Sequence, residues 1–397
     1  MKKLLIVAAL GMFCTSGMAQ SAKDNKEEGF VFTTVKENPI TSVKNQNRAG
    51  TCWCYSSMAF LEAELLRMGK GEYDFSEMFI VHNTYLDRAD KAVRTHGDVS
   101  FSQGGSFYDV LYGMEKFGLV PEEEMRPGVM YGDTLSNHTE LSAVSNAVVA
   151  AIAKGRSRSL QADKNNVLLW KKSIEAIHDI YLGERPEKFT YKGKEYTPQS
   201  FYAEFVGEDY QNDYIMLMND PTREYWKTYE IQYDRHTYDG HNWLYLNLPI
   251  EDIKEMAIAS IKDSTMMYFS CDVSKELDSK RGLLDMDNYD YESLLGIKFG
   301  MDKAQRIRVF DSGSSHAMTM MAVELDAEGK PTMWKVENSW GAASGHKGHL
   351  IMTDEWFNEY MFRLVVNKKY ANDRVLKAAK QKPIQLPCWD PMFMGEE

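Results

Sequence analysis

The chain has 397 residues, of which 44% are hydrophobic and 26% charged, and its formal net charge is −12. This composition excludes disordered and fibrous proteins, and the length suits one large domain or two lobes around a substantial core. An acidic surface repels phosphate backbones, so we expect no nucleic-acid partner. The sequence contains no metal-ligand spacing and no phosphate-binding loop, so it implies no metal and no cofactor.

Residues 1–19 have the pattern of an export signal. A basic start at 1–3 is followed by an apolar stretch at 4–13, which is too short to span a bilayer, and by small residues up to Ala19. We expect cleavage after Ala19 and a periplasmic or secreted mature protein. Cys14 leaves a lipoprotein as an alternative, although bulky residues precede it. No later segment predicts a membrane span.

The remaining chain reads as helices followed by strands. Apolar residues at helical spacing predict helices over 52–68, 107–117, 141–152, 167–180 and 249–261, and a further helix start at Pro121. Apolar runs between Gly and Asp turns predict strands over 266–271, 316–325 and 333–337. Because strands and helices do not alternate, we expect an α+β fold with segregated layers.

Cys52 carries the first chemical signal. A thiol attacks well only as a thiolate, and a free cysteine with a pKa near about 8.5 is only slightly ionised at neutral pH. A helix N-terminus and a nearby imidazole both favour the thiolate, and a good Cys–His pair lowers the thiol pKa to roughly 3–4. Cys52 follows Gly50 at the expected helix start, so it is a candidate nucleophile; a small buried residue is the alternative. Cys54 faces the other side of that helix and is assigned to packing.

His316 is the candidate base among the 9 histidines. It follows small residues and begins an apolar strand, so a substrate can reach it while the strand holds it rigidly. Further on, Asn338 can accept the proton of the far ring nitrogen, which fixes the tautomer without adding a charge. Trp340 can cover that hydrogen bond. Each residue taken alone also fits an ordinary strand end or turn.

The remaining cysteines leave one question open. An exported protein can hold disulfides, but four cysteines in the mature chain do not form a disulfide scaffold. Cys271 and Cys388 are read as buried free thiols, with a bond between them as the alternative.

These motifs in this order resemble the papain superfamily of cysteine peptidases, in which a Cys-His-Asn set is a known constellation. The motifs are Gln46, Gly50-x-Cys52-Trp53, His316-Ala317-Met318 and Asn338-Ser339-Trp340-Gly341. Further stretches resemble the bleomycin hydrolase/aminopeptidase C branch: Ser102-Gln103-Gly104-Gly105, Lys116-Phe117-Gly118-Leu119-Val120-Pro121, Met352-Thr353-Asp354-Glu355-Trp356-Phe357 and Leu386-Pro387-Cys388-Trp389-Asp390-Pro391-Met392.

The resemblance implies a papain-like two-lobe fold, with a helical lobe, an antiparallel β-barrel-like lobe and a helical insertion. It places the nucleophile's lobe at 20–135, the insertion at 136–245, the β-rich lobe with the base at 246–385 and a C-terminal arm at 386–397, entering the cleft. It also implies a homo-oligomer, a hexamer in that branch.

The resemblance further implies roles for single residues. Gln46 and the backbone N–H of Cys52 would form the oxyanion hole, and Trp53 and Trp340 would support the catalytic residues. Gly104 and Gly105 would line the cleft and bind the substrate backbone. The terminal carboxylate of Glu397 would face the α-ammonium of the substrate, although Phe393 and Met394 replace small residues of the family's arm.

The prediction is therefore an exported cysteine aminopeptidase that acts on peptides through a thioester on Cys52. A papain-type endopeptidase or dipeptidyl-peptidase is the first alternative. A peptide-binding protein without catalysis is an alternative of another class. An acyltransferase also remains open, because an amine can capture the thioester in place of water.

Overall fold

We describe the fold from a computed structural model of the chain. The described residues are 32–33, 36–99, 101–155, 168–207, 210–232, 234–240, 242–298 and 300–394. The chain divides into residues 1–33 and one compact unit, residues 34–397, and the description concerns that unit. No helix among the described residues is long and apolar enough to cross a membrane. The expected signal peptide lies outside the described residues.

The first third of the unit is helical. It contains α1 (Cys52–Arg67), α2 (Glu77–Arg94) and α3 (Phe107–Phe117), followed by the short 3-10 turns η1 (Glu122–Glu124) and η2 (Val129–Tyr131). The helices predicted at 52–68 and 107–117 are confirmed. A capping box formed by Ser106 and Asp109 starts α3, and Gly118 ends it with a positive φ of 86°. The helix expected at Pro121 is only the η1 turn.

Residues 136–245 differ in part from the helical insertion that we expected. The helices α4 (Thr139–Lys154), α5 (Leu169–Leu182) and α6 (Pro198–Phe205) are present, with a small hairpin of β2 (Phe189–Tyr191) and β3 (Lys194–Tyr196). After the turn η4 (Tyr210–Asp213), however, β4 (Tyr214–Met218), β5 (Lys227–Ile231) and β6 (Leu244–Asn247) join the main sheet. The helical part therefore ends well before residue 245.

A 12-stranded, mostly antiparallel sheet forms the rest of the unit, in the order β14-β5-β6-β4-β13-β7-β10-β11-β12-β9-β8, with β1 paired to β10. Its central strands are β7 (Met267–Cys271), β10 (His316–Leu325), β11 (Pro331–Glu337) and β13 (Met361–Asn367). The predicted strands at 266–271, 316–325 and 333–337 are confirmed, as is the α+β class. The other strands are β1 (Lys36–Glu37), β8 (Leu277–Asp278), β9 (Leu283–Leu284), β12 (His349–Thr353) and β14 (Ile384–Leu386).

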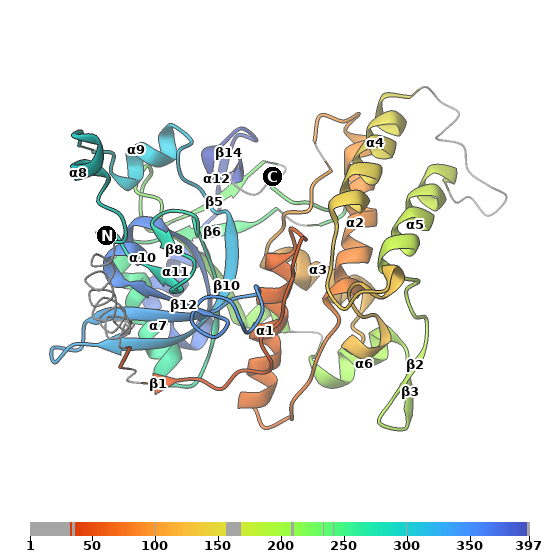
Figure 1. The fold of residues 1–397 in the computed structure, drawn as a ribbon, viewed down its shortest axis with the longest axis horizontal. Coiled ribbons are helices and arrows are strands. Elements are labelled where there is room, and N and C mark those ends of the chain that lie inside the picture. The colour runs from red at the N-terminus through yellow and green to blue at the C-terminus, as the bar shows by residue number, and fades with distance from the viewer. Residues whose placement is uncertain are drawn as a thin grey trace, which may run out of the picture. The chain divides into compact units, whose positions relative to one another are not determined.

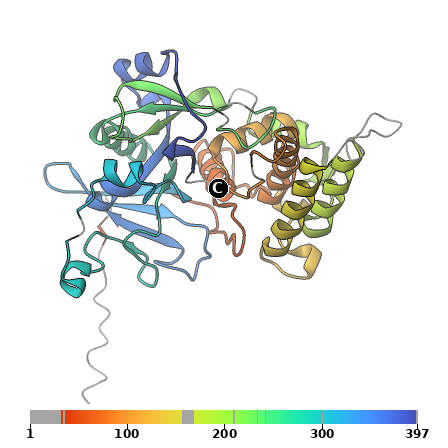
Figure 2. The same cartoon turned by 90° about the horizontal axis from the view of Figure 1, so that it is seen from above.

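Short helices cover the sheet and its connections. They are α7 (Ile250–Lys262), α8 (Tyr291–Leu295), α9 (Lys303–Arg308), α10 (Asp354–Tyr360), the turn η5 (Lys368–Tyr370), α11 (Asp373–Ala379) and α12 (Pro391–Met394). Figures 1 and 2 show α2, α4 and α5 as a layer on the far side of α1 and α3 from the sheet. The helix α1 thus lies between the outer helices and the strands.

Reciprocal hydrogen bonds join α1 to β10. The Ser56 hydroxyl donates to the Met318 carbonyl at 2.7 Å, and the Thr319 hydroxyl donates to the Ser56 carbonyl at 3.1 Å. Both hydroxyls are buried, so leaving either bond unmade would cost free energy. This pair of bonds fixes α1 at Ser56, four residues after Cys52, against the first half of β10.

Candidate active site

Cys52 is the first residue of α1, where the sequence places it. The preceding Thr51 is the N-cap residue and its side chain makes no capping hydrogen bond, so the first N–H groups of the helix remain directed toward this end. The Cys52 side chain is partly exposed and lines a cavity of about 470 Å³, whereas Cys54 is fully buried in the core. The helix start thus presents the thiol to the cavity, and the packing role of Cys54 is confirmed.

His316 and Asn338 form the second part of the site. His316 begins β10 and lines the same cavity, and its Nε2 lies 2.8 Å from Oδ1 of Asn338, which directly follows β11. Because Oδ1 also accepts the backbone N–H of Ser339 at 2.8 Å, it is the acceptor and the imidazole Nε2–H is the donor. Nδ1 is then the basic nitrogen of neutral His316. The Trp340 ring lies 5.0 Å from the imidazole at an angle of 31° and covers it.

Burial acts on both reacting groups. It raises the pKa of the Cys52 thiol, while hydrogen bonding from the backbone at Ala317, Trp53 and Cys52 lowers that pKa by less. Burial also lowers the pKa of His316 to about 4, against the hydrogen bond to Asn338, which raises it. Burial thus opposes the charged form of each group taken alone, so the ion pair expected from the sequence depends on the attraction between the two charges. His316 is therefore able to accept a proton as the thiol reacts.

The segment that contains Gln46 pairs with the segment that follows Asn338. Residues 44–46 run antiparallel to 339–341, and the Gln46 backbone N–H donates to the Ser339 carbonyl at 2.8 Å. Its side-chain Oε1 accepts the Ser339 hydroxyl at 2.5 Å, and its Nε2 donates to the Ala49 carbonyl at 2.6 Å. The amide is thus held between the segment before Cys52 and the segment after Asn338. The structure does not place it among the residues that line the cavity.

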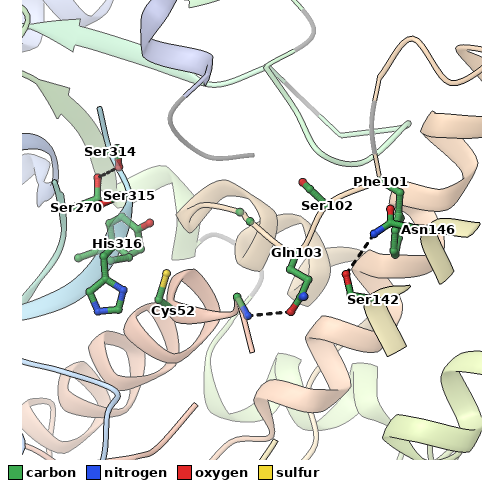
Figure 3. A pocket seen from close by; sticks show the side chains of 15 residues that line it. Cys52, Phe101, Ser102, Gln103, Ser142, Asn146, Ser270, Ser314, Ser315 and His316 are labelled. Carbon is green, nitrogen blue, oxygen red and sulfur yellow. Dashed lines mark hydrogen bonds between the residues drawn. The ribbon is translucent and has the colours of Figure 1, made fainter. Parts of the chain in front are cut away.

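The cavity has one wall from each side of α1. One wall is the loop 102–105 with Ser142 and Asn146 of α4, and the other is formed by β7 and by the residues that precede β10 (Figure 3). Gly104 and Gly105 are both in the first wall, as predicted. The volume of the cavity, about 470 Å³, lies within the range usual for ligand pockets. A peptide segment can therefore lie between the two walls and across the Cys52 thiol.

Buried polar contacts hold the 102–105 wall. The Trp53 indole N–H donates to the Gln103 carbonyl at 2.9 Å, and the Gly50 N–H donates to the Gln103 side chain at 2.9 Å. The Arg88 guanidinium stacks on the Trp53 ring at 4.8 Å and donates to the carbonyls of Ser102 and Gly104. Trp53, which directly follows the nucleophile Cys52 in the chain, is thereby bonded to the cleft wall.

Arg88 belongs to a network that the sequence did not reveal. Its charge is balanced by Asp109 of α3, 3.7 Å away, and Asp109 in turn lies 2.9 Å from Nδ1 of His236. All three side chains are buried or nearly so. Asp109 has a detectable signal as the N3 residue of a capping box, but nothing in the local sequence indicates its contact with Arg88.

Two further expectations concern residues away from the reacting groups. Cys52, Cys54, Cys271 and Cys388 are all free, so the structure has no bond between Cys271 and Cys388. The predicted substrate-binding carboxylate of Glu397 lies outside the described residues.

The chain is similar to known proteins of one family. The Peptidase C1-like family matches residues 2–393 of the chain. Human bleomycin hydrolase (Homo sapiens) is 34% identical over 89% of this chain and 85% of its own length. Aminopeptidase C of Lactococcus lactis subsp. cremoris is 30% identical over 90% of this chain and 86% of its own length.

A solved structure shows the same fold. PepW from Lactobacillus rhamnosis HN001 superposes with a TM-score of 0.76 at 26% identity, over 91% of this chain and 88% of that one. The match spans both the outer helices and the sheet. The chain therefore belongs to the Peptidase C1-like family, together with bleomycin hydrolase and aminopeptidase C.

Proposed function

We propose that the chain is a cysteine aminopeptidase that removes single N-terminal residues from peptides, with Cys52 as nucleophile, His316 as base and Asn338 as the residue that orients His316. The observation that carries this proposal is the 2.8 Å hydrogen bond from His316 Nε2 to Asn338 Oδ1, beside a cavity that Cys52 and His316 both line. Family membership supports the reaction class, because relatives at 30–34% identity are named aminopeptidase C and bleomycin hydrolase.

The reaction has two stages. Cys52 Sγ attacks the carbonyl carbon of the peptide bond while His316 Nδ1 takes the thiol proton, and the tetrahedral intermediate then collapses as the imidazolium gives this proton to the leaving amine. Cys52 is left as a thioester of the N-terminal residue. Water, deprotonated by His316, adds to the thioester, and the departing thiolate is protonated again as the amino acid leaves.

Two groups are available to stabilise the negative oxygen of each intermediate. The Cys52 backbone N–H is at the helix start, and the side-chain amide of Gln46, six residues earlier in the chain, is held by hydrogen bonds to Ser339 and Ala49. The second hydrogen of Gln46 Nε2 is not used in the bond to Ala49, and because Gln46 is not among the residues that line the cavity, its amide must turn toward the substrate to donate this hydrogen to an oxyanion. Donors fixed in advance act strongly in a site that excludes water.

The exopeptidase preference and the location complete the proposal. The C-terminal arm limits the cleft on the side of the substrate's N-terminus, so that a free α-ammonium fits and a longer chain does not. Residues 1–19 direct the chain out of the cytoplasm, and the mature chain assembles as a homo-oligomer. N-terminal sequencing of protein from the native host tests cleavage after Ala19, and light scattering tests the oligomer.

The central experiment compares two substrates in parallel. Protein that begins at Gln20 is assayed under reducing conditions with fluorogenic single-residue amides, either with a free amine or N-acetylated, and Cys52→Ala serves as the matched control. We expect cleavage of the free-amine substrates only, and none by Cys52→Ala. Equal cleavage of both substrates would move the enzyme to the endopeptidase class. Equal rates in Cys52→Ala and the unaltered chain would overturn the cysteine mechanism.

A further inference from the structure

The C-terminal segment is anchored to the sheet at β14. The strand β14 pairs in parallel with β5, and the Gln232 N–H extends that pairing to the Leu386 carbonyl at 2.9 Å. A turn follows, closed by a hydrogen bond of 3.0 Å from the Asp390 N–H to the Pro387 carbonyl. The chain then enters α12.

Arg223 holds Asp390 with both arms of its guanidinium. Nη2 lies 3.0 Å from Oδ1 of Asp390 and Nη1 lies 3.2 Å from Oδ2, while Nε donates to Asp220 at 2.6 Å. The three side chains are 13%, 8% and 0% exposed, so the charges are largely out of water. Because Asp220 fixes the guanidinium plane, Arg223 offers Asp390 a prepared two-pronged site. Asp390 also accepts the Met392 N–H at 3.0 Å, which fixes the start of α12.

Arg363 holds the next part of the arm. Its Nη2 donates to the Met392 carbonyl at 2.8 Å, and its guanidinium lies over the rings of Trp243 and Tyr245 at 5.3 and 4.9 Å. Arg363 is fully buried and Met392 is 3% exposed. The backbone of the arm is thus fixed at Met392 by a rigid, buried donor.

The register of the sheet places this anchor beside the cavity. Arg363 on β13 pairs with Ser270 on β7, and paired residues on neighbouring strands point to the same face of a sheet. Ser270 lines the cavity and accepts the Ser314 hydroxyl at 3.0 Å (Figure 3). The residue that holds Met392 is therefore only one strand away from the cavity wall.

We propose that Arg223 and Arg363 are positioning residues that clamp the C-terminal arm at Asp390 and Met392, and that this clamp sets the preference for substrates with a free N-terminus. The inference rests on the proposed function, because it names what fixes the arm that limits the cleft. Neither arginine lines the cavity, so both act through the arm and not on the substrate.

The experiment measures the ratio of kcat/KM for a free-amine amide to kcat/KM for its N-acetylated form. The first variant is Asp390→Asn, which keeps the shape of the side chain and alters only the arm. The second is Arg223→Gln, and the third ends the chain after Leu386 as a reference for a released arm. Arg94→Gln is the matched control, because it removes a half-exposed arginine that is paired with Asp90 on α2. A thiol-directed epoxide titrates Cys52 in every variant and reports whether the reacting groups are intact.

We expect the ratio to fall about 10-fold or more in Asp390→Asn and Arg223→Gln, the loss typical of charge-assisted hydrogen bonds, with faster cleavage of the N-acetylated amide. Arg94→Gln should keep the ratio of the unaltered chain. An unchanged ratio in both clamp variants, with full epoxide labelling, would overturn the inference while leaving the aminopeptidase function in place. Loss of labelling together with both activities would assign the arginines to folding alone. A chain that cleaves both amides equally before any substitution would overturn the inference and the exopeptidase function together.

Discussion

Gly105 offers the sharpest test of the cleft wall. A Cβ at this position would lie 2.6 Å from Cδ2 of Trp53 and 2.7 Å from Nη2 of Arg88, whereas nonbonded carbon atoms prefer about 3.5–4.0 Å. Neither neighbour is free to withdraw, because Trp53 is fully buried and bonded to the Gln103 carbonyl, and Arg88 is buried and bonded to the Ser102 and Gly104 carbonyls. Gly105→Ala must therefore push the 102–105 loop toward the cavity.

The size of the effect follows from this crowding. Overpacking of this kind costs about 1–3 kcal/mol. If the displaced loop must return to its original position for the transition state to form, this energy adds to the activation barrier. Because about 1.4 kcal/mol corresponds to a factor of ten, kcat/KM then falls roughly 5- to 150-fold.

The assay is kcat/KM on a free-amine amide, with thermal unfolding measured beside it. Gly300→Ala is the matched control, because a Cβ there meets no described atom within 4 Å and the backbone φ is not positive. Activity of Gly105→Ala within twofold of the unaltered chain, at an unchanged unfolding midpoint, would refute the reasoning.

Three further predictions concern protonation and the oxyanion. Because the pKa of His316 is lowered to about 4, the imidazole stays neutral until the pH falls near that value, and the acid limb of kcat/KM should lie well below pH 6.5. Asn338→Ala should move this limb lower still, because it removes the hydrogen bond that raises the pKa of His316. An acid limb at or above pH 6.5 contradicts this prediction. Gln46→Ala should lower kcat by about 10²–10³, measured against epoxide-titrated sites, and a loss below threefold would remove Gln46 from the oxyanion hole. Burial lowers the pKa of His178 to about 3, so this imidazole is neutral in both the folded and the unfolded chain above pH 6.5. Below pH 6.5 the imidazole of the unfolded chain binds a proton first. The contribution of His178 to the free energy of unfolding, measured in urea, should therefore decrease from pH 7 to pH 5. On going from pH 7 to pH 5, the unaltered chain should accordingly lose more stability, or gain less, than His178→Phe; equal slopes would exclude this role.

The elements that the sequence predicts well are those with a clear apolar period. The helices α1 and α3 have such a period, and α3 also has its capping box and final glycine. The strand β10 is buried over its first eight residues and was instead predicted from its long apolar run after small residues. The helix α2 was missed because its buried face includes His82, Asn83, Thr84 and Arg88, which interrupt the apolar stripe. The strand β4 is buried along its whole length, so it lacks the alternation that marks a strand.

The reacting residues could be predicted because each has a local motif, but the groups that hold them could not. Arg88, Asp109 and His236 come from three segments, and their contacts arise only when α2, α3 and the connection before β6 pack together. The same is true of Arg223 and Asp390, which are 167 residues apart. The ion pair expected for Cys52 and His316 stays a prediction, because burial, which opposes both charges, is a property of the folded chain and not of a motif.

The hydrogen bonds between α1 and β10 also decide when activity can arise. They join residues 262 and 263 positions apart in the sequence, so the nucleophile and its base meet only after the strands of the last third have paired. Contacts of such high sequence separation form slowly, because the loop between them must first be closed. A chain that is still being synthesised or only partly folded therefore has a thiol without a base. The topology itself thus delays proteolysis until folding is complete.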